Sequence, residues 1–342
     1  MNVNYGDIPV LTKEDFKVKD PVKWCSGCGG HSVLSSVQNA LPEIGIEKEK
    51  IVFVSGIGCS SRFPYYINTY GFHGLHGRAV PVASGLKISN PELSVWVVTG
   101  DGDLLAIGGN HFIHVVRRNI DLNILLFNNK IYGLTKGQYS PTTPLGGVTK
   151  TSPDGTVENP LKPGELTIGA QGTFFARAVD TDPKLMKDVF VKAAQHKGTS
   201  VVEVLQNCVI FANESHAEIT GKDVREDNQL ILEHGKPMIY GKERDKGLIL
   251  DKTRLKAVKI GENGFGQEDI LVHDATTADP SIHFMLAMMS LPEFPVAMGV
   301  IRSVESPTYE YLLYSQISSN KTKSPLKTMD DLLKSGNVFE VK

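Results

Sequence analysis

The 342-residue sequence has few cysteines, almost no net charge and no long hydrophobic run. Four cysteines, two of them in a C-x-x-C, are too few for a disulfide framework in a chain of this size. No apolar stretch approaches the length of a membrane span, and the polar N-terminus lacks the apolar core of a signal peptide. We therefore expect a soluble, cytoplasmic protein.

An excess of either charge is also missing. Lysine and arginine total 36 against 38 acidic residues, so the formal net charge is −2. The signs are mixed and form no basic run, which argues against nucleic acid as the main partner. The length allows one large or two small domains with a sizeable core, so an ordinary globular protein is expected.

Residues 93–129 are the stretch from which the fold can best be predicted. They begin with an apolar, β-branched run that predicts a buried strand and ends in the turn Gly100-Asp101-Gly102-Asp103. A helix-length stretch with apolar residues at helical spacing follows, and 122–127 predicts a second buried strand. Strand, turn, helix and strand of this length form one right-handed βαβ unit, which predicts an α/β protein with a parallel sheet.

The turn carries a carboxylate at a place suited to phosphate. Glycines at a strand-to-helix turn let a ligand approach the backbone, and a helix N-terminus favours anions, but Asp101 would repel a phosphate. A divalent cation removes the conflict, because Mg²⁺ commonly bridges protein oxygens and diphosphate oxygens. Asn129 ends the next strand and can reach the same ion. A dinucleotide fingerprint fits poorly, since the next glycine after Gly102 is Gly108.

Other chemically active residues also follow predicted strands. Cys59 and Cys208 each lie just beyond a short apolar run. The carboxyl ends of parallel strands meet at one edge of a sheet, where ligands bind, so these cysteines are expected to gather there with Asp101 and Asn129. Residues 136–164, rich in glycine, proline and threonine, are expected to form an active-site loop.

The cysteines suggest a metal site. Cys25 and Cys28 form a C-x-x-C in glycine-rich surroundings, and Cys59 and Cys208 complete a set of four with none left over. Four thiolates suit a structural zinc and an iron–sulfur cluster equally well. Four unrelated buried thiols are a third interpretation.

The Gly-Asp-Gly turn, about 25 intervening residues and the pair Asn128-Asn129 resemble the thiamine diphosphate enzymes. The continuation Ile131-Tyr132-Gly133-Leu134-Thr135-Lys136-Gly137-Gln138 is similar to the β subunit of 2-oxoacid:ferredoxin oxidoreductases, especially the 2-oxoglutarate type. The resemblance covers roughly residues 20–215. It implies a doubly wound, mostly parallel α/β sheet of the thiamine diphosphate-binding type.

The resemblance also implies an activity and its partners. The cofactors are thiamine diphosphate, Mg²⁺ and one 4Fe–4S cluster. The reaction is the coenzyme A-dependent oxidative decarboxylation of a 2-oxoacid, most simply 2-oxoglutarate, or its reversal by reductive carboxylation with CO₂. Ferredoxin is the electron partner. An α subunit supplies the glutamate that faces the aminopyrimidine ring, which makes the enzyme a heterodimer or a dimer of heterodimers.

Site residues follow from the same resemblance. The cluster ligands are Cys25, Cys28, Cys59 and Cys208. The Mg²⁺ ligands are Asp101, Asn129 and the main-chain carbonyl of Ile131. The residues along the thiamine cofactor are Ile57, Gly58, Cys59, Ser60, His76, Gly102, Asp103, Gly133 and Leu134. The catalytic candidates are His76 and Lys136, the second as a cation for a substrate carboxylate.

The predicted organisation is an N-terminal arm over 1–22, a cofactor-binding domain over 23–215 and a C-terminal extension over 216–342. Three alternative functions remain at this stage. The substrate is pyruvate or a branched 2-oxoacid in the first. The second is a non-oxidative thiamine decarboxylase or ligase, which needs no convergent cysteines. The third is a binding module stabilised by zinc.

Overall fold

An eight-stranded sheet forms the centre of the molecule, which the computed structural model describes for residues 11–339 and 341. In spatial order its strands are β2 (Tyr70–His73), β1 (Ile51–Ser55), β3 (Ser94–Gly100), β4 (Asn123–Asn128), β8 (Ser200–Leu205), β7 (Phe174–Val179), β13 (Val296–Ser303) and β9 (Gln229–Leu232). All neighbours run parallel except β7 and β13. The predicted mostly parallel α/β sheet is confirmed, and β3 and β4 form the predicted βαβ unit.

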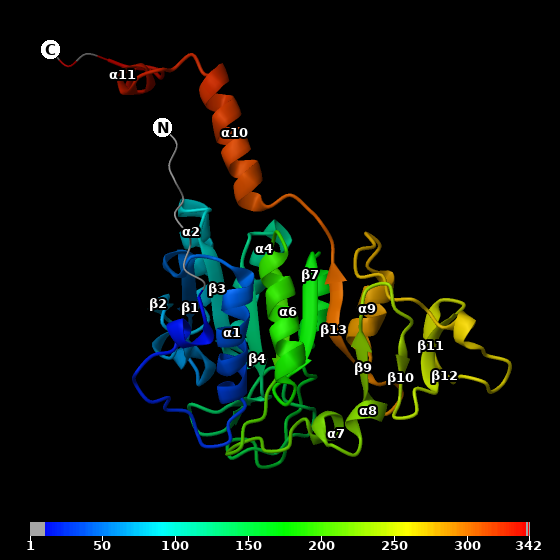
Figure 1. Cartoon of the computed structure of the whole chain (residues 1–342). Coiled ribbons are helices and arrows are strands. Elements are labelled where there is room, and N and C mark those ends of the chain that lie inside the picture. The colour runs from blue at the N-terminus through cyan, green and yellow to red at the C-terminus, as the bar shows by residue number, and fades with distance from the viewer. Residues whose placement is uncertain (1–10, 340, 342) are drawn as a thin grey trace.

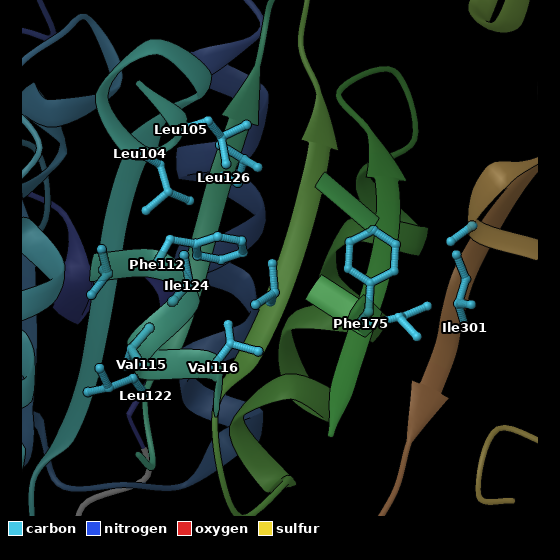
Figure 2. Close-up of a cluster of buried hydrophobic side chains, with 14 of the residues drawn as sticks. Leu104, Leu105, Phe112, Val115, Val116, Leu122, Ile124, Leu126, Phe175 and Ile301 are labelled. Atoms are coloured by element: carbon cyan, nitrogen blue, oxygen red, sulfur yellow. The ribbon is translucent and has the colours of Figure 1, made fainter. Parts of the chain in front are cut away.

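Helices cover both faces of the sheet, as a doubly wound fold requires (Figure 1). They are α1 (Gly30–Ile44), α2 (Ala79–Ser89), α3 (Asp101–Leu105), α4 (Gly109–Arg118), α5 (Pro163–Gly169), α6 (Pro183–Gln195) and α9 (Ser281–Met288). On one face α1 and α6 bury Phe53, Trp96 and Phe190. The other face carries α2, α4, α5 and α9, and Figure 2 shows Phe112 and Val116 of α4 packed beside β4.

The helix predicted after the Gly-Asp-Gly turn is wrong in one respect, because it is two helices. The chain leaves the helical conformation at Ala106 (ψ −106°) between α3 and α4. Gly108 lies so close to α3 that a Cβ there would stand 2.6 Å from the carbonyl oxygen of Asp103. The break leaves Ile107 54% exposed between the two helices. It lets α3 stay at the end of β3 while α4 packs on the sheet.

Residues beyond 215 continue the same sheet, because β13 pairs with β7 and β9 pairs with β13. Shorter elements surround this part and the site. They are β5 (Ile131–Tyr132), β6 (Gln138–Tyr139), α7 (Ala217–Thr220), α8 (Arg225–Asn228), β10 (Ile239–Tyr240), β11 (Lys246–Asp251), β12 (Arg254–Lys259), α10 (Tyr309–Lys323) and α11 (Met329–Leu333). The 3-10 helices are η1 (Lys13–Phe16), η2 (Lys48–Lys50), η3 (Ser60–Tyr65) and η4 (Gln267–Asp269). In Figure 1, α10 and α11 extend away from the body of the molecule.

The predicted N-terminal arm is described only in part. Residues 1–10 of the predicted N-terminal arm lie outside the described residues. The remainder of the arm includes η1, whose Phe16 is buried and packs beside α1. None of the helices in residues 11–339 has the length and apolar character that a membrane span requires.

Candidate functional site

A cavity of about 490 Å³ lies where β1, β3 and β4 end. Every residue predicted to contact the thiamine cofactor or its cation lines this cavity. These residues are Ile57, Gly58, Cys59, Ser60, His76, Asp101, Gly102, Asp103, Asn129, Ile131, Gly133 and Leu134. Larger hollows of about 950 and 1190 Å³ beside the C-terminal extension contain none of them.

Lys136, the other catalytic candidate, does not line the cavity. It is exposed, and its backbone is left-handed with φ +76°. Its main-chain N–H donates to the carbonyl of Gly133, which closes a turn just beyond the lining residues. The side chain is therefore near the site without forming its wall.

Asp101 is the first residue of α3 and is 1% exposed. Burial raises the pKa of its carboxyl group, and hydrogen bonds from the hydroxyls of Ser140 and Thr142 oppose this rise. Both hydroxyls contact Oδ2, with the Thr142 oxygen at 2.6 Å. Sequence reasoning identified the loop over 136–164 but missed these two residues, whose only signal was a Ser/Thr-rich segment after the Asn pair. The loop orients the carboxylate that is predicted to bind the cation.

A buried polar chain continues from Thr142 into the sheet. The Thr142 hydroxyl oxygen also lies 2.9 Å from Asn128 Oδ1, so its single proton serves two acceptors. Asn128 Nδ2 donates to Glu203 Oε1 at 2.7 Å. Glu203 Oε2 in turn accepts from Arg177 Nε at 2.7 Å, which forms a buried ion pair between β8 and β7. Asn128 therefore supports the loop, while Asn129 lines the cavity.

The side chain of Asp103 joins three segments of the site. Its Oδ1 accepts hydrogen bonds from the main-chain N–H groups of Ile57 (3.0 Å) and Gly77 (2.7 Å). Its Oδ2 accepts one from the hydroxyl of Thr99 at 2.8 Å. A Cβ at Gly56 would lie 2.2 Å from Oδ2, so the approach of the carboxylate requires glycine there. The sequence predicted only a main-chain role for Asp103, and this bracing of two cofactor loops was missed.

His76 lies at the cavity wall beside the same carboxylate. Its Nδ1 is 2.9 Å from Asp103 Oδ1 but lacks the alignment of a hydrogen bond. The ring centroid lies 6.1 Å from that of Tyr132. The imidazole thus lies near a carboxylate and an aromatic ring at the wall of the cavity that it lines.

Tyr132 is a lining residue to which sequence reasoning gave no role. Its hydroxyl donates to the carbonyl of Gly102 at 3.0 Å, and a Cβ at Gly102 would lie 2.2 Å from its ring. Burial, followed by the nearby charges of Asp101 and Asp103, raises the pKa of Tyr132 to about 12. The phenol therefore remains a donor and holds the turn. Other lining residues without a predicted role are Gly100, Thr135 and Gln138.

The four cysteines carry free thiols and influence one another electrostatically. Burial raises the pKa of Cys59 to about 11, with further contributions from Cys208, Cys28 and Cys25. A Cβ at Gly133 would stand 3.6 Å from the sulfurs of both Cys59 and Cys208. Cys59 and Gly133 also line the cavity, so the thiols of Cys59 and Cys208 adjoin it. Across the described residues, no three His, Cys, Asp or Glu side chains form a ready site for one metal ion.

Comparisons with known proteins agree with this geometry. Residues 56–204 match the family model of the thiamine pyrophosphate enzymes, C-terminal TPP binding domain. The chain is 45% identical over 316 residues to the 2-oxoglutarate oxidoreductase subunit KorB of Mycobacterium tuberculosis, which covers 92% of this chain and 84% of that protein. It is 48% identical over 188 residues to the 2-oxoglutarate synthase subunit KorB of Archaeoglobus fulgidus, or 55% of this chain and 70% of the relative.

A solved structure extends the similarity to the whole fold. It is the 2-oxoglutarate:ferredoxin oxidoreductase from Magnetococcus marinus with 2-oxoglutarate, coenzyme A and succinyl-CoA bound. The match has a TM-score of 0.77 at 29% identity and covers 97% of this chain and 98% of that one. Together with the long match to the mycobacterial subunit, this establishes that the chain belongs to the β-subunit family of the 2-oxoacid:ferredoxin oxidoreductases.

Proposed function

We propose that this chain is the cofactor-binding β subunit of a cytoplasmic 2-oxoglutarate:ferredoxin oxidoreductase. The reaction removes CO₂ and two electrons from the 2-oxoacid and passes the acyl group to coenzyme A, or runs in reverse. Thiamine diphosphate supplies the nucleophilic carbon for this chemistry, and a 4Fe–4S cluster supplies a one-electron acceptor. The observation that carries the proposal is that Cys59 itself lines the cavity, and that a Cβ at Gly133, another lining residue, would stand 3.6 Å from the sulfurs of both Cys59 and Cys208.

The proposed cation site uses the oxygens at one wall of the cavity. A carboxylate from Asp101, an amide oxygen from Asn129 and the main-chain carbonyl of Ile131 are the hard ligands that Mg²⁺ prefers. The contacts from Ser140 and Thr142 leave Asp101 braced rather than free to rotate. This preorganisation supports a role in neutralising a diphosphate.

The proposed cluster ligands are Cys25, Cys28, Cys59 and Cys208. Their free thiols and mutual electrostatic influence are consistent with four ligands around one group. Thiolates bind the cluster, and bound iron offsets both the burial and the neighbouring thiolates that raise the pKa of Cys59. A zinc tetrathiolate uses the same residue types, so metal analysis must separate the two.

A partner α subunit is part of the proposal. The carboxylates that line the cavity within the described residues are Asp101 and Asp103, and both are already hydrogen-bonded inside this chain. The glutamate expected against the aminopyrimidine ring must then come from another chain. Apolar side chains exposed beside the cavity, such as Leu75 (76%) and Leu134 (48%), fit a covered surface in the assembly.

Lys136 keeps its proposed role as a cation for the second carboxylate of 2-oxoglutarate. It follows Leu134 and Thr135, which line the cavity, and its own side chain is exposed rather than paired within the wall. A substitution Lys136→Met should therefore raise KM for 2-oxoglutarate more than KM for pyruvate. Equal changes for both substrates would contradict this role.

The proposal is tested on the complex with its α subunit, purified without oxygen. Iron and acid-labile sulfide near four per β chain, with no zinc, would support it, because one cubane cluster uses four thiolates. Adding 2-oxoglutarate and coenzyme A should then reduce the cluster rapidly, whereas pyruvate or a branched 2-oxoacid should reduce it much more slowly. Zinc near one per chain without sulfide would overturn the electron-transfer role. Cluster reduction by pyruvate in place of 2-oxoglutarate would overturn the substrate assignment.

A further inference from the structure

Gln206 lies one residue beyond β8 and occupies the space between the cavity and the cysteines. It is 3% exposed. Its main-chain N–H donates to the carbonyl of Asn128 at 3.0 Å, which fixes its position at the end of β4. Its side chain was not predicted to have any role.

The side-chain amide contacts both parts of the site. Its Oε1 accepts a hydrogen bond from Asn129 Nδ2 at 3.0 Å. Its Nε2 donates to the sulfur of Cys28 and to the carbonyl of Asn207, each at 3.1 Å. Among the described residues, no other side chain donates to a cysteine sulfur.

The orientation of this amide follows from its partners. The carbonyl of Asn207 can only accept, so the nitrogen of Gln206 must face it. Cys28 is on that same side, which makes its sulfur the acceptor of an N–H group. The remaining oxygen faces the amide nitrogen of Asn129, so donors and acceptors match all around the amide.

We propose that Gln206 is a positioning residue that couples the cation site to the cluster, orienting Asn129 with its oxygen and stabilising the Cys28 thiolate with its nitrogen. This inference rests on the proposed function, since it assumes a cluster on Cys28. A reduced cluster carries one more negative charge than an oxidised one, and an N–H group directed at a ligand sulfur stabilises that charge. Gln206 therefore makes the cluster easier to reduce by the cofactor beside it.

Two substitutions separate the functions of the amide. Gln206→Met keeps the length of the side chain and removes all three of its hydrogen bonds. Gln206→Glu keeps an oxygen for Asn129 and removes the donor to Cys28. The control is Gln38→Met, because Gln38 is another buried glutamine, on α1, whose amide donates only to the main-chain carbonyls of Phe16 and Tyr66.

The experiment is a mediator-based redox titration of the complex with its α subunit, with the cluster followed by electron paramagnetic resonance. We expect the equilibrium constant for cluster reduction to fall about tenfold in Gln206→Met, which is about 59 mV for one electron. Gln206→Glu should shift the potential in the same direction. Affinity for thiamine diphosphate with Mg²⁺ should fall severalfold in Gln206→Met and stay near wild type in Gln206→Glu. Gln38→Met should change neither property.

The inference is overturned if Gln206→Met binds a full cluster whose reduction potential equals that of the wild type. It is also overturned if Gln38→Met shifts the reduction potential as much as Gln206→Met does. Equal loss of cofactor affinity in both Gln206 variants would overturn the assignment of its oxygen to Asn129. These outcomes are distinct from failure of the proposed function. That failure appears in the wild-type complex as missing iron and sulfide, before any variant is compared.

Discussion

Buried polar groups have different partners in two regions of the molecule. One region is the sheet edge that carries the cavity, and the other is the C-terminal region after residue 215. At the edge, a series of side chains bond to one another from Asp101 through Thr142 and Asn128 to Glu203, beside carboxylate contacts to main-chain N–H groups at Asp103. In the C-terminal region, Arg302 is satisfied mainly by main chain, since it donates to the carbonyls of Gly172, Thr277 and Ala278.

Two histidines of the C-terminal region also bond to main-chain carbonyls. In the C-terminal region, His283 joins Arg302 through its Nδ1 and the carbonyl of Asp274 through its Nε2, both at 2.8 Å. His273 contacts the carbonyl of Val300. Main-chain partners fasten one segment to another, whereas linked side chains position functional groups at a cavity. The comparison predicts that changes at the edge alter cofactor affinity and that changes in the C-terminal region alter stability.

The largest effect is expected from Asp101→Ala. Without this carboxylate the proposed Mg²⁺ loses a protein ligand, so binding of thiamine diphosphate with Mg²⁺ should fall below detection in calorimetric titration of the complex. Asp154→Ala is the control, because Asp154 is an exposed aspartate of the neighbouring loop. Wild-type affinity in Asp101→Ala would exclude Asp101 as a cation ligand.

Arg302→Met tests the other half of the comparison. It removes the donors to three carbonyls and leaves His283 Nδ1 without its partner, so the free energy of unfolding should fall by about 3 kcal/mol. Cofactor affinity should be unchanged. Urea unfolding measures the first property and calorimetry the second, with the exposed Arg254→Met as the control. A loss of affinity without a loss of stability would break the division between the two regions.

Thr142→Val should have a smaller effect, confined to the edge. The valine keeps the shape of the side chain and removes the hydroxyl that contacts Asp101 and Asn128. A residue that orients a metal ligand typically contributes about tenfold in affinity, so the dissociation constant for the Mg²⁺-dependent cofactor should rise by about that factor. Thr151→Val, on an exposed part of the same loop, should leave it unchanged. If both variants bind alike, the hydroxyl does not orient the carboxylate.

The smallest expected effect is a pH dependence of stability from His216, which begins the C-terminal region and whose Nε2 lies 3.0 Å from the carbonyl oxygen of Asn128. Burial, followed by the charge of Lys130, lowers the pKa of His216 to about 4. In the unfolded chain this pKa is about 6.5, so the unfolded state binds more protons between these values and stability falls as the pH drops below 6.5. The contribution is about 1 kcal/mol at pH 5.5 relative to pH 7.

Urea unfolding at the two pH values measures this contribution of His216 to the free energy of unfolding. His216→Gln should reduce the difference in unfolding free energy by about 1 kcal/mol. His234→Gln, which changes an exposed histidine of the C-terminal region, should leave it unaltered. An equal pH dependence in wild type and His216→Gln would exclude His216 as its source.

Local patterns in the sequence were sufficient to locate the site. Apolar runs identified β1, β3, β4 and β8, and the polar residues at their ends were expected to meet because parallel strands bring their carboxyl ends to one edge. The cavity lined by Asp101, Asn129 and Cys59 agrees with that expectation. The prediction for Lys136 was based on its nearness in sequence alone, and the structure leaves it outside the cavity wall.

Hydrophobic periodicity and short motifs are local properties, so the amino-acid sequence was enough to predict the central βαβ unit, the family and the residues around the cavity. Only the tertiary structure decided that Asp103 braces two loops, that Thr142 reaches Asp101 and that Gln206 joins Asn129 to Cys28. It also decided that β9 and β13 extend the sheet beyond residue 215. Such contacts join segments that are far apart in the chain, and their distances depend on packing rather than on any local pattern.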